Sequence, residues 1–385
     1  MPATIKIALD CRDINIATTG THTYLSELIT AFNRQHNNQV SFVFIKPFIG
    51  VMPGNNAFAK LIRHFQFFFY KQITLPILTF LNGASVLICT DYVVPVFTPG
   101  FKTIVVFHDA FFWEYPLHYS ALWLRMFKAV AVAGAKKSVA VIAPSEYAKK
   151  QIALHTGISA THIKVVYEAP KTFAQINPQT PAQTNSQPAQ SIQPSPQMSA
   201  PYFLHVGTLA KHKNLPLLIE AFAKLDKHLK LVLVGGAPSS VHNSDVPNIN
   251  DAIQKHNLQN QVVLTGYLSN AEVANWYANA LGYVFPSYNE GFGLPILEAM
   301  QYKLPIIAAN NTCLPEIAQG GALYFDPTNI DQLASQMQAI VNNTPAVTAT
   351  LDAQPTVLQH FSWNKAAASF VAIALDGLKN ASKHA

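Results

Sequence analysis

The sequence predicts an α/β protein made of two doubly wound domains, each built on a parallel sheet. Short runs rich in Val, Ile and Leu alternate with longer helical patterns through both halves of the 385 residues. These runs lack an apolar–polar alternation, which is typical of strands buried on both faces of a parallel sheet. A segment dominated by Gln, Pro, Ser, Ala and Thr separates the halves at 171–200, and its composition is typical of a linker or long loop.

The N-terminal domain is predicted at 1–170 and the C-terminal domain at 201–363. The strands predicted in the first are Ile5–Leu9, Val40–Ile45, Val86–Cys89, Thr103–Phe107 and Val139–Ala143, with helices at Thr23–Asn33 and Ser120–Lys137. Those predicted in the second are Tyr202–Val206, Leu229–Val234, Gln261–Thr265, Gly282–Phe285, Ile306–Ala309 and Ala322–Phe325, with helices at Leu215–Leu225, Asn270–Asn279 and Asn329–Val341. Such domains bind ligands beyond the carboxyl ends of their strands, and two of them facing across a cleft can hold a two-part ligand.

The composition is that of a folded chain, with 50% hydrophobic and 12% charged residues. Apolar runs stay below the roughly 20 residues of a membrane-spanning helix. The N-terminus lacks the apolar core of a signal peptide, which predicts a cytoplasmic protein. The three cysteines, Cys11, Cys89 and Cys313, are widely spaced without a metal-ligand pattern, and we interpret them as reduced and structural.

The net charge of +6 is unevenly distributed, with +7 in residues 1–170 and −1 in residues 171–385. A basic face can attract anionic lipid, a phosphorylated acceptor or nucleic acid, or be a solvated surface without a specific role. The sequence has no recognised nucleic-acid-binding motif, so we predict no nucleic-acid partner.

The strongest motif follows the strand Gly282–Phe285 and reads NEGFGLPILE, from Asn289 to Glu298. Gly291 and Gly293 allow a sharp turn and a close approach of the backbone to a ligand, and Pro295 suits the first turn of a helix. The start of that helix favours an anion such as phosphate. Two carboxylates flank the turn, one placed to meet a sugar and the other a ribose diol. Separately, each glutamate would be read as a surface charge or a helix-dipole partner.

A second motif, GTLAKHKNL at Gly207–Leu215, follows the strand Tyr202–Val206. Its lysines and histidine crowd a strand-to-helix turn where a cation can pair with a diphosphate, and Asn214 is a candidate helix cap. The alternative interpretation of this motif is a solvated basic loop, which its place at the carboxyl end of a strand disfavours. Two weaker motifs lie in the N-terminal domain. The turn Thr19–Tyr24 resembles a phosphate-contacting turn but has one glycine, Gly20, so by itself a plain loop is the favoured interpretation. His108-Asp109 ends a strand, where a packed histidine is the alternative to a catalytic one.

Together these motifs resemble glycosyltransferase family 4. The paired glutamates Glu290 and Glu298 are similar to that family's signature, and the other landmarks follow in the family's order over nearly the whole chain. They are the Gly20 turn, His108-Asp109, APSEY at 143–147, VGTL at 206–209, KNL at 213–215, GYL at 266–268 and FSW at 361–363.

The resemblance implies a GT-B architecture, two Rossmann-like domains facing across a cleft, with helix 364–380 packing back onto the N-terminal domain. It also implies a retaining hexosyltransferase of polysaccharide or glycoconjugate synthesis, with mannose as the favoured sugar, a glycan or lipid-linked acceptor, and no cofactor or metal site. Catalytic roles fall on Glu290, His108 and Lys213. Donor binding falls on Gly20, Gly207, Thr208, His212, Lys213, Gly266, Tyr267, Glu290, Gly291, Phe292, Gly293, Leu294 and Glu298.

The chain departs from the family's pattern at Thr208 and His212, where many members have Arg. One cation of the phosphate site is then missing or supplied elsewhere. Rival functions are another GT-B enzyme, such as a sugar-nucleotide epimerase or phosphorylase, and a non-catalytic nucleotide-sugar-binding protein.

An aromatic and basic stretch at Phe58–Leu81 has two interpretations. It either lies on the inner face of the membrane and reaches a lipid-linked acceptor, or packs against the sheet with its basic residues outside. Packing is favoured for Ile73–Leu81, and both remain open for Phe58–Tyr70.

Overall fold

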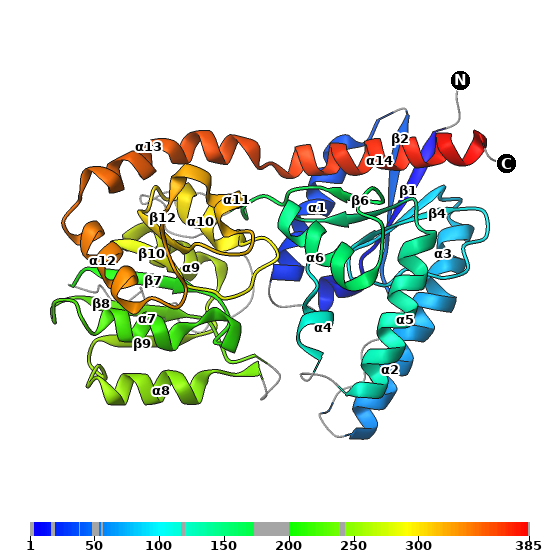
Figure 1. Cartoon of the computed structure of the whole chain (residues 1–385). Helices are drawn as coiled ribbons and strands as arrows, with labels where there is room; N and C mark the ends of the chain where they lie inside the picture. The colour runs from blue at the N-terminus through cyan, green and yellow to red at the C-terminus, as the bar shows by residue number, and fades with distance from the viewer. Residues whose placement is uncertain are drawn as a thin grey trace, which may run out of the picture. The chain divides into compact units, whose positions relative to one another are not determined.

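The computed structural model describes residues 4–16, 20–37, 39–47, 54, 57–116, 120–172, 200–238 and 243–383. Nearly all of the predicted linker therefore lies outside the described residues. The chain divides into two compact units, which we describe separately (Figure 1). Unit 1 comprises residues 1–169 and 361–385, and unit 2 comprises residues 170–360.

Unit 1 contains a six-stranded parallel sheet in the order β2-β1-β3-β4-β5-β6. The strands are β1 Ile5–Asp10, β2 Val40–Ile45, β3 Val86–Cys89, β4 Lys102–Val106, β5 Ala140–Ala143 and β6 Ile163–Val165. The five predicted strands are confirmed to within one residue at either end, whereas β6 was not predicted. Because β1 and β3 are neighbours while β2 lies beyond β1, the strand order reverses direction between β1 and β3. This switch point is where ligands bind in doubly wound domains.

Helices flank this sheet. They are η1 Arg12–Asn15, α1 Gly20–Gln35, α2 Ala57–Phe69, the π-helical turn η2 Tyr70–Thr74, α3 Leu75–Leu81, α4 Phe111–Glu114, α5 Ala121–Lys137, α6 Glu146–Thr156 and α14 Trp363–Lys383. The last of them, α14, runs along α1 (Figure 1), with Trp363 against Tyr24 and Phe370 against Phe32 at ring-centroid distances of 5.4 and 6.0 Å. Aromatic contacts of this kind anchor the final helix to the N-terminal stretch of unit 1.

The close approach of α14 depends on Gly377, whose hypothetical Cβ would lie 2.7 Å from the Cβ of Val139. In an otherwise unobstructed helix, Ala is about 1 kcal/mol more favourable than Gly. We expect Gly377→Ala instead to destabilise the protein by about 1 kcal/mol, because overpacking costs roughly 1–3 kcal/mol. Urea unfolding of the variant measures this. In a Val139→Gly background, which removes the Cβ and both methyl groups that a Cβ at position 377 would meet, the same substitution should become stabilising. A stabilising effect in the wild-type background would contradict the packing argument.

The segment α2–η2–α3 corrects one expectation and bears out another. Lys71, expected outside, is fully buried and forms ion pairs with Asp10 and Asp91. The segment Ile73–Leu81, expected to pack against the sheet, does so through one face only, because Ile77 and Leu81 are exposed. Exposed apolar side chains recur every three or four residues along α2, η2 and α3, and together they form an apolar stripe. Across the π-helical turn η2 the spacing is four residues, from Phe69 to Ile73, and the stripe stays on one face. Its side chains are 44–71% exposed: Phe58, Leu61, Phe65, Phe69, Ile73, Ile77, Phe80 and Leu81.

Unit 2 contains a second six-stranded parallel sheet, in the order β12-β11-β10-β7-β8-β9. The strands are β7 Tyr202–Val206, β8 Lys230–Val234, β9 Val262–Gly266, β10 Gly282–Phe285, β11 Ile306–Ala309 and β12 Leu323–Phe325. All six predicted strands are confirmed to within one residue. The helical segments are η4 Lys211–Lys213, α7 Leu215–Phe222, α8 Val246–Lys255, α9 Asn270–Asn279, α10 Leu294–Gln301, α11 Leu314–Ala318, η6 Gln319–Gly321, α12 Ile330–Val341 and α13 Pro345–His360. The strand order reverses between β7 and β10, so the carboxyl ends of these two strands mark the expected ligand site.

Candidate functional site

The two strongest motifs meet at the switch point of unit 2. Lys213 follows β7 and Glu290 follows β10, and their side chains form an ion pair with an Nζ–Oε1 distance of 2.6 Å. The Nζ of Lys213 also lies 5.1 Å from the centre of the Phe285 ring. Burial raises the pKa of Glu290, but the charges of Lys213 and His212 and the hydrogen bond from Lys213 outweigh burial and lower it. Glu290 is therefore an ionised carboxylate in a largely enclosed place.

The loop between Glu290 and α10 is held in a defined shape. Gly293 has a φ of +98°, and Pro295 lies in the first turn of α10, as predicted. Gly291, predicted to share the sharp turn, does not have a positive φ. The buried thiol of Cys313 donates to the carbonyls of Glu290 and Phe292, at 3.2 Å each. All three cysteines are free, as predicted, and burial keeps the pKa of Cys313 well above its usual value, so it remains a donor.

Glu298 lies on α10 and is 9% exposed, with its Oε2 accepting a hydrogen bond from the hydroxyl of Tyr277 at 3.2 Å. Burial raises the pKa of Glu298 to about 7, against the opposing effects of Tyr277 and Lys171. A buried carboxyl group with one internal donor retains capacity to accept further hydrogen bonds.

Three glycines mark the carboxyl ends of neighbouring strands: Gly207 follows β7, Gly235 follows β8, and Gly266 ends β9. The amide of Gly207 donates to Val234, and the amide of Gly235 donates to Gly266. A Cβ on Gly235 would lie 1.9 Å from the carbonyl oxygen of Gly207, and Gly235 has a φ of +142°. Gly235 was not predicted from the sequence, although the Gly-Gly pair directly after a predicted strand was a usable signal. The three turns bring backbone to the surface where side chains would otherwise stand.

Three other residues predicted to bind the donor, Thr208, His212 and Tyr267, lie in or beside these turns. Thr208 accepts a backbone hydrogen bond from Ala210 at 2.8 Å, and the carbonyl of His212 accepts one from Tyr288 at 2.7 Å. Tyr267 is 72% exposed just beyond β9. Asn214 corrects a prediction, because its side chain makes no cap hydrogen bond to α7. It donates instead to the carbonyls of Pro286 and Pro327, at 3.2 and 2.9 Å, and so ties the β7 turn to the end of β10.

His205 is a second residue that the sequence analysis missed. It is fully buried in β7, with Nδ1 3.0 Å from the carbonyl oxygen of Val284, while Nε2 has no partner among the described residues. Burial lowers the pKa of His205 to about 4, so the ring is neutral and donates from Nδ1. A Cβ on Gly207 would lie 3.1 Å from Nε2 of His205, so a larger residue at position 207 would crowd the ring. A polar residue inside an apolar strand was the available signal.

In unit 1, His108 is held from both sides. Nδ1 lies 3.2 Å from Oε1 of Glu168, and Nε2 lies 2.9 Å from the carbonyl oxygen of Thr90. Both partners are acceptors, so the protonated imidazole, which has a donor on each ring nitrogen, is the form that satisfies both contacts. Burial lowers the pKa of His108, but the bonds to Glu168 and Thr90 and the charges of Glu168 and Asp109 outweigh it, and the net shift is upward. In this arrangement both polar atoms of His108 are occupied within the protein.

The raised pKa of His108 predicts a pH-dependent contribution to stability. A histidine with a raised folded-state pKa stabilises fully below its unfolded pKa of about 6.5, and this contribution is lost as the pH rises through the higher folded-state value. Wild type and Glu168→Gln should therefore differ in unfolding free energy at about pH 5.5 and converge at about pH 9 in urea titrations. A difference that grows with pH would contradict the assignment.

Gly20 opens α1, and a Cβ there would meet nothing within 4 Å. The residues 17–19 before it, including Thr19 of the predicted turn, lie outside the described residues. Glycine at this position therefore has no steric requirement from the described neighbours.

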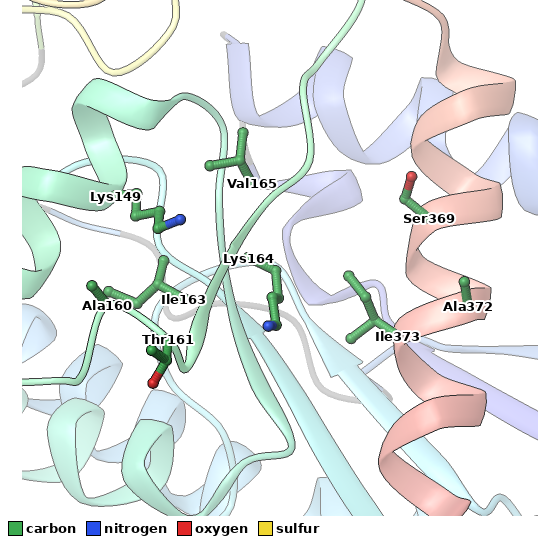
Figure 2. A pocket seen from close by; sticks show the side chains of 9 residues that line it. All are labelled: Lys149, Ala160, Thr161, Ile163, Lys164, Val165, Ser369, Ala372 and Ile373. Carbon is green, nitrogen blue, oxygen red and sulfur yellow. The ribbon is translucent and has the colours of Figure 1, made fainter.

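A separate pocket of about 410 Å³ lies between α6, β6 and α14 (Figure 2). Lys149 and Lys164 line it together with Ser369 and Ile373, and no predicted site residue does. No group of three or more His, Cys, Asp or Glu among the described residues is arranged to hold a metal ion. No helix in the described parts of the chain is both long and apolar enough to span a membrane.

The chain is similar to known proteins in sequence and in fold. Residues 186–351 match the family model described as Glycosyl transferases group 1. O-antigen chain mannosyltransferase B of Escherichia coli is 29% identical over 166 residues, which are 42% of this chain and 42% of that protein. The chain thus spans less than half of the length of this curated relative.

Among solved structures, sucrose-phosphate synthase from Thermosynechococcus elongatus aligns with a TM-score of 0.72 and 16% identity, over 98% of this chain and 100% of that one. Anabaena Alr3699/HepE in complex with UDP-glucose aligns with a TM-score of 0.64 and 18% identity, over 98% and 100%. These likenesses concern the fold, and they confirm the predicted GT-B class of two doubly wound α/β domains.

Proposed function

We propose that the protein is a glycosyltransferase of glycan synthesis that transfers a hexose from a nucleotide diphosphate sugar. The observation that carries the proposal is the Lys213–Glu290 pair at the switch point of unit 2. It lies beside glycine turns that expose backbone, in the part of the chain that matches the group 1 family model. A cation and a carboxylate side by side suit a donor with an anionic diphosphate and a hydroxyl-rich sugar.

Within this proposal, Lys213 binds the diphosphate and Glu290 contacts the donor sugar. In the free protein they neutralise each other, so the ammonium is preorganised and adds no net positive charge to its surroundings. When the bond to the anomeric carbon breaks, negative charge develops on the departing diphosphate, and Lys213 and the amides at the start of α10 oppose it. An acceptor attacking from the same face gives its proton to the leaving phosphate, which yields retention of configuration, as in glycosyltransferase family 4.

The remaining donor contacts are assigned from the same resemblance and the local geometry. Glu298 accepts hydrogen bonds from the ribose, for which its carboxyl group has capacity besides the Tyr277 bond. The exposed Tyr267 lies along the base, and the backbone of Gly207, Gly266 and Phe292–Leu294 lines the phosphates and sugar. In unit 1, Gly20 approaches the phosphates, and the imidazole of His108, held by Glu168 and Thr90, contacts the sugar.

We favour mannose as the sugar because a curated relative is named as a mannosyltransferase. The solved neighbour that holds UDP-glucose makes a uridine donor the alternative. The test is a thermal-shift screen of the protein against GDP, UDP, ADP and dTDP and their common sugars. A ligand at about 100 times its dissociation constant adds roughly 2.7 kcal/mol of stability. One strong stabiliser whose effect is lost in Lys213→Met supports the proposal. No response to any of them by the well-folded protein overturns it.

We also propose that the acceptor is lipid-linked and that the apolar stripe of α2–η2–α3 rests on an anionic membrane surface. Residues 46–108 carry five Lys and Arg but one acidic residue, Asp91, and Lys71 is its ion-pair partner. An exposed apolar face in surroundings almost free of carboxylates is suited to anionic headgroups.

Flotation with vesicles tests the membrane contact. The protein should bind anionic vesicles at low salt, and replacing Phe58, Leu61 and Phe65 by Ser should abolish binding, whereas the exposed Leu154→Ser in α6 should not. Absence of binding by the wild type to anionic vesicles would exclude the contact.

A further inference from the structure

The carboxyl ends of β1 and β3, at the switch point of unit 1, carry a buried charged cluster that the proposed function does not use. Asp10 ends β1, Asp91 lies two residues beyond β3, and the Nζ of Lys71 forms ion pairs with both. Lys71 belongs to the π-helical turn η2. Single π-helical turns are rare and occur frequently at functional sites.

Each member of the cluster has a defined place. Lys71 is fully buried and Asp10 is 3% exposed. Oδ1 of Asp10 also accepts hydrogen bonds from the hydroxyl of Tyr70 at 2.9 Å and from the amide of Arg12 at 3.0 Å. Asp10 is thus bound to the backbone after β1 as well as to η2. Burying such a group of charges is a poor way to gain stability, because desolvation can exceed the attraction between them. We therefore look for the role of the cluster in the positions in which it holds the neighbouring residues.

The cluster holds the segment Thr90–Tyr92, because Asp91, the second ion-pair partner of Lys71, belongs to this segment. The carbonyl oxygen of Thr90 lies 2.9 Å from Nε2 of His108, and the hydroxyl of Tyr92 donates to Oδ1 of Asp109 at 2.7 Å. Asp91 stands between these two residues. Tyr92 has a φ of +68°, a conformation that costs free energy in a residue other than glycine. A strained segment needs an anchor, and the ion pair of Asp91 with Lys71 provides one.

We propose that Lys71 is a positioning residue: by holding Asp91, it fixes the segment Thr90–Tyr92 that orients the imidazole of His108. Lys71 reaches the reaction only through Asp91 and the backbone of Thr90. The inference rests on the proposed function, in which His108 contacts the donor sugar.

The test compares two substitutions, each of which neutralises one of the two carboxylates that pair with the ammonium of Lys71. Asp91→Asn weakens the anchor of the segment that holds His108, whereas Asp10→Asn weakens the pair on the β1 side. If the cluster served stability alone, both variants would change the protein alike. We expect Asp91→Asn to lower kcat by about tenfold, which is 1.4 kcal/mol, with an unchanged dissociation constant for the donor nucleotide. Asp10→Asn should lower kcat by less than about threefold at a similar loss of thermal stability.

A second readout does not require turnover. The ring of His108, assigned in NMR spectra by comparison with His108→Gln, should titrate at lower pH in Asp91→Asn, because the bond to Thr90 that favours the protonated ring is weakened. In Asp10→Asn its titration should stay close to that of the wild type. Tyr92→Phe removes one hydroxyl at a partly buried site. Like Asp91→Asn, it should lower kcat and the pH at which His108 titrates, so it serves as the test if Asp91→Asn does not fold.

Equal kcat values and equal His108 titrations in Asp91→Asn and Asp10→Asn would overturn the proposal. A wild-type protein that binds no donor would overturn the proposed function instead. In that case the titration of His108 still decides whether Lys71 positions it, so the two failures can be told apart.

Discussion

Glu290→Ala is expected to lower kcat by a factor on the order of 10² to 10³, equivalent to about 2.7–4 kcal/mol of transition-state stabilisation. The substitution removes the carboxylate that we propose contacts the donor sugar, and it leaves Lys213 without its 2.6 Å partner. The freed ammonium binds the ground-state diphosphate at least as well as before, so the loss should fall on kcat rather than on donor affinity. Steady-state turnover and a direct donor-binding titration separate the two.

The matched control is Glu220→Gln on α7, which breaks an exposed pair with Lys255 in the same unit. Exposed pairs contribute little, so kcat and stability should stay near those of the wild type. A loss of kcat below about tenfold in Glu290→Ala, or about 1.4 kcal/mol, would contradict the role given to this carboxylate.

The largest effect on stability is expected at Gly235, next to the Lys213–Glu290 pair. A Cβ there would stand 1.9 Å from the carbonyl oxygen of Gly207, and a φ of +142° is open almost only to glycine. We expect Gly235→Ala to destabilise unit 2 by about 3 kcal/mol or more, from roughly 1–3 kcal/mol of backbone strain and a similar cost of overpacking. For a unit of this size the melting temperature should fall by roughly 10 °C, as measured by calorimetry on the full chain.

Gly236→Ala is the control, because a Cβ at Gly236 meets nothing within 4 Å and its φ is not positive. This neighbour should melt within about 2 °C of the wild type. Similar melting temperatures for the two variants would mean that the turns after β7 and β8 can separate without cost.

Much of the fold was predictable because buried parallel strands are short apolar runs, which the sequence displays without ambiguity at places such as Tyr202–Val206. The strand β6 was missed because it has three residues and carries Lys164 in its middle, too short a pattern to recognise. The exposed face of α3 was missed for a different reason. Its residues are apolar all round, so only the packing of neighbouring elements decides which side is buried.

The candidate site was partly predictable. Lys213 and Glu290 could be placed together because both follow strands that a doubly wound order makes neighbours. The ion pairs of Lys71 could not be foreseen, since its partners lie 61 and 20 residues away and a basic residue in a helix is usually solvated. The double occupation of the His108 ring likewise depends on Glu168 and Thr90, 60 and 18 residues away.

The division of unit 1 into residues 1–169 and 361–385 has a consequence for biosynthesis. A nascent chain leaves the ribosome with all of unit 2 before α14 exists to cover Phe32 and Tyr24 on α1. At roughly 5–20 residues per second, this interval lasts about 10–40 s. During that time the apolar side of α1 is open to chaperones and to other nascent chains. The yield of folded protein should therefore depend on how fast the ribosome translates the codons for unit 2, although the residues at risk belong to unit 1.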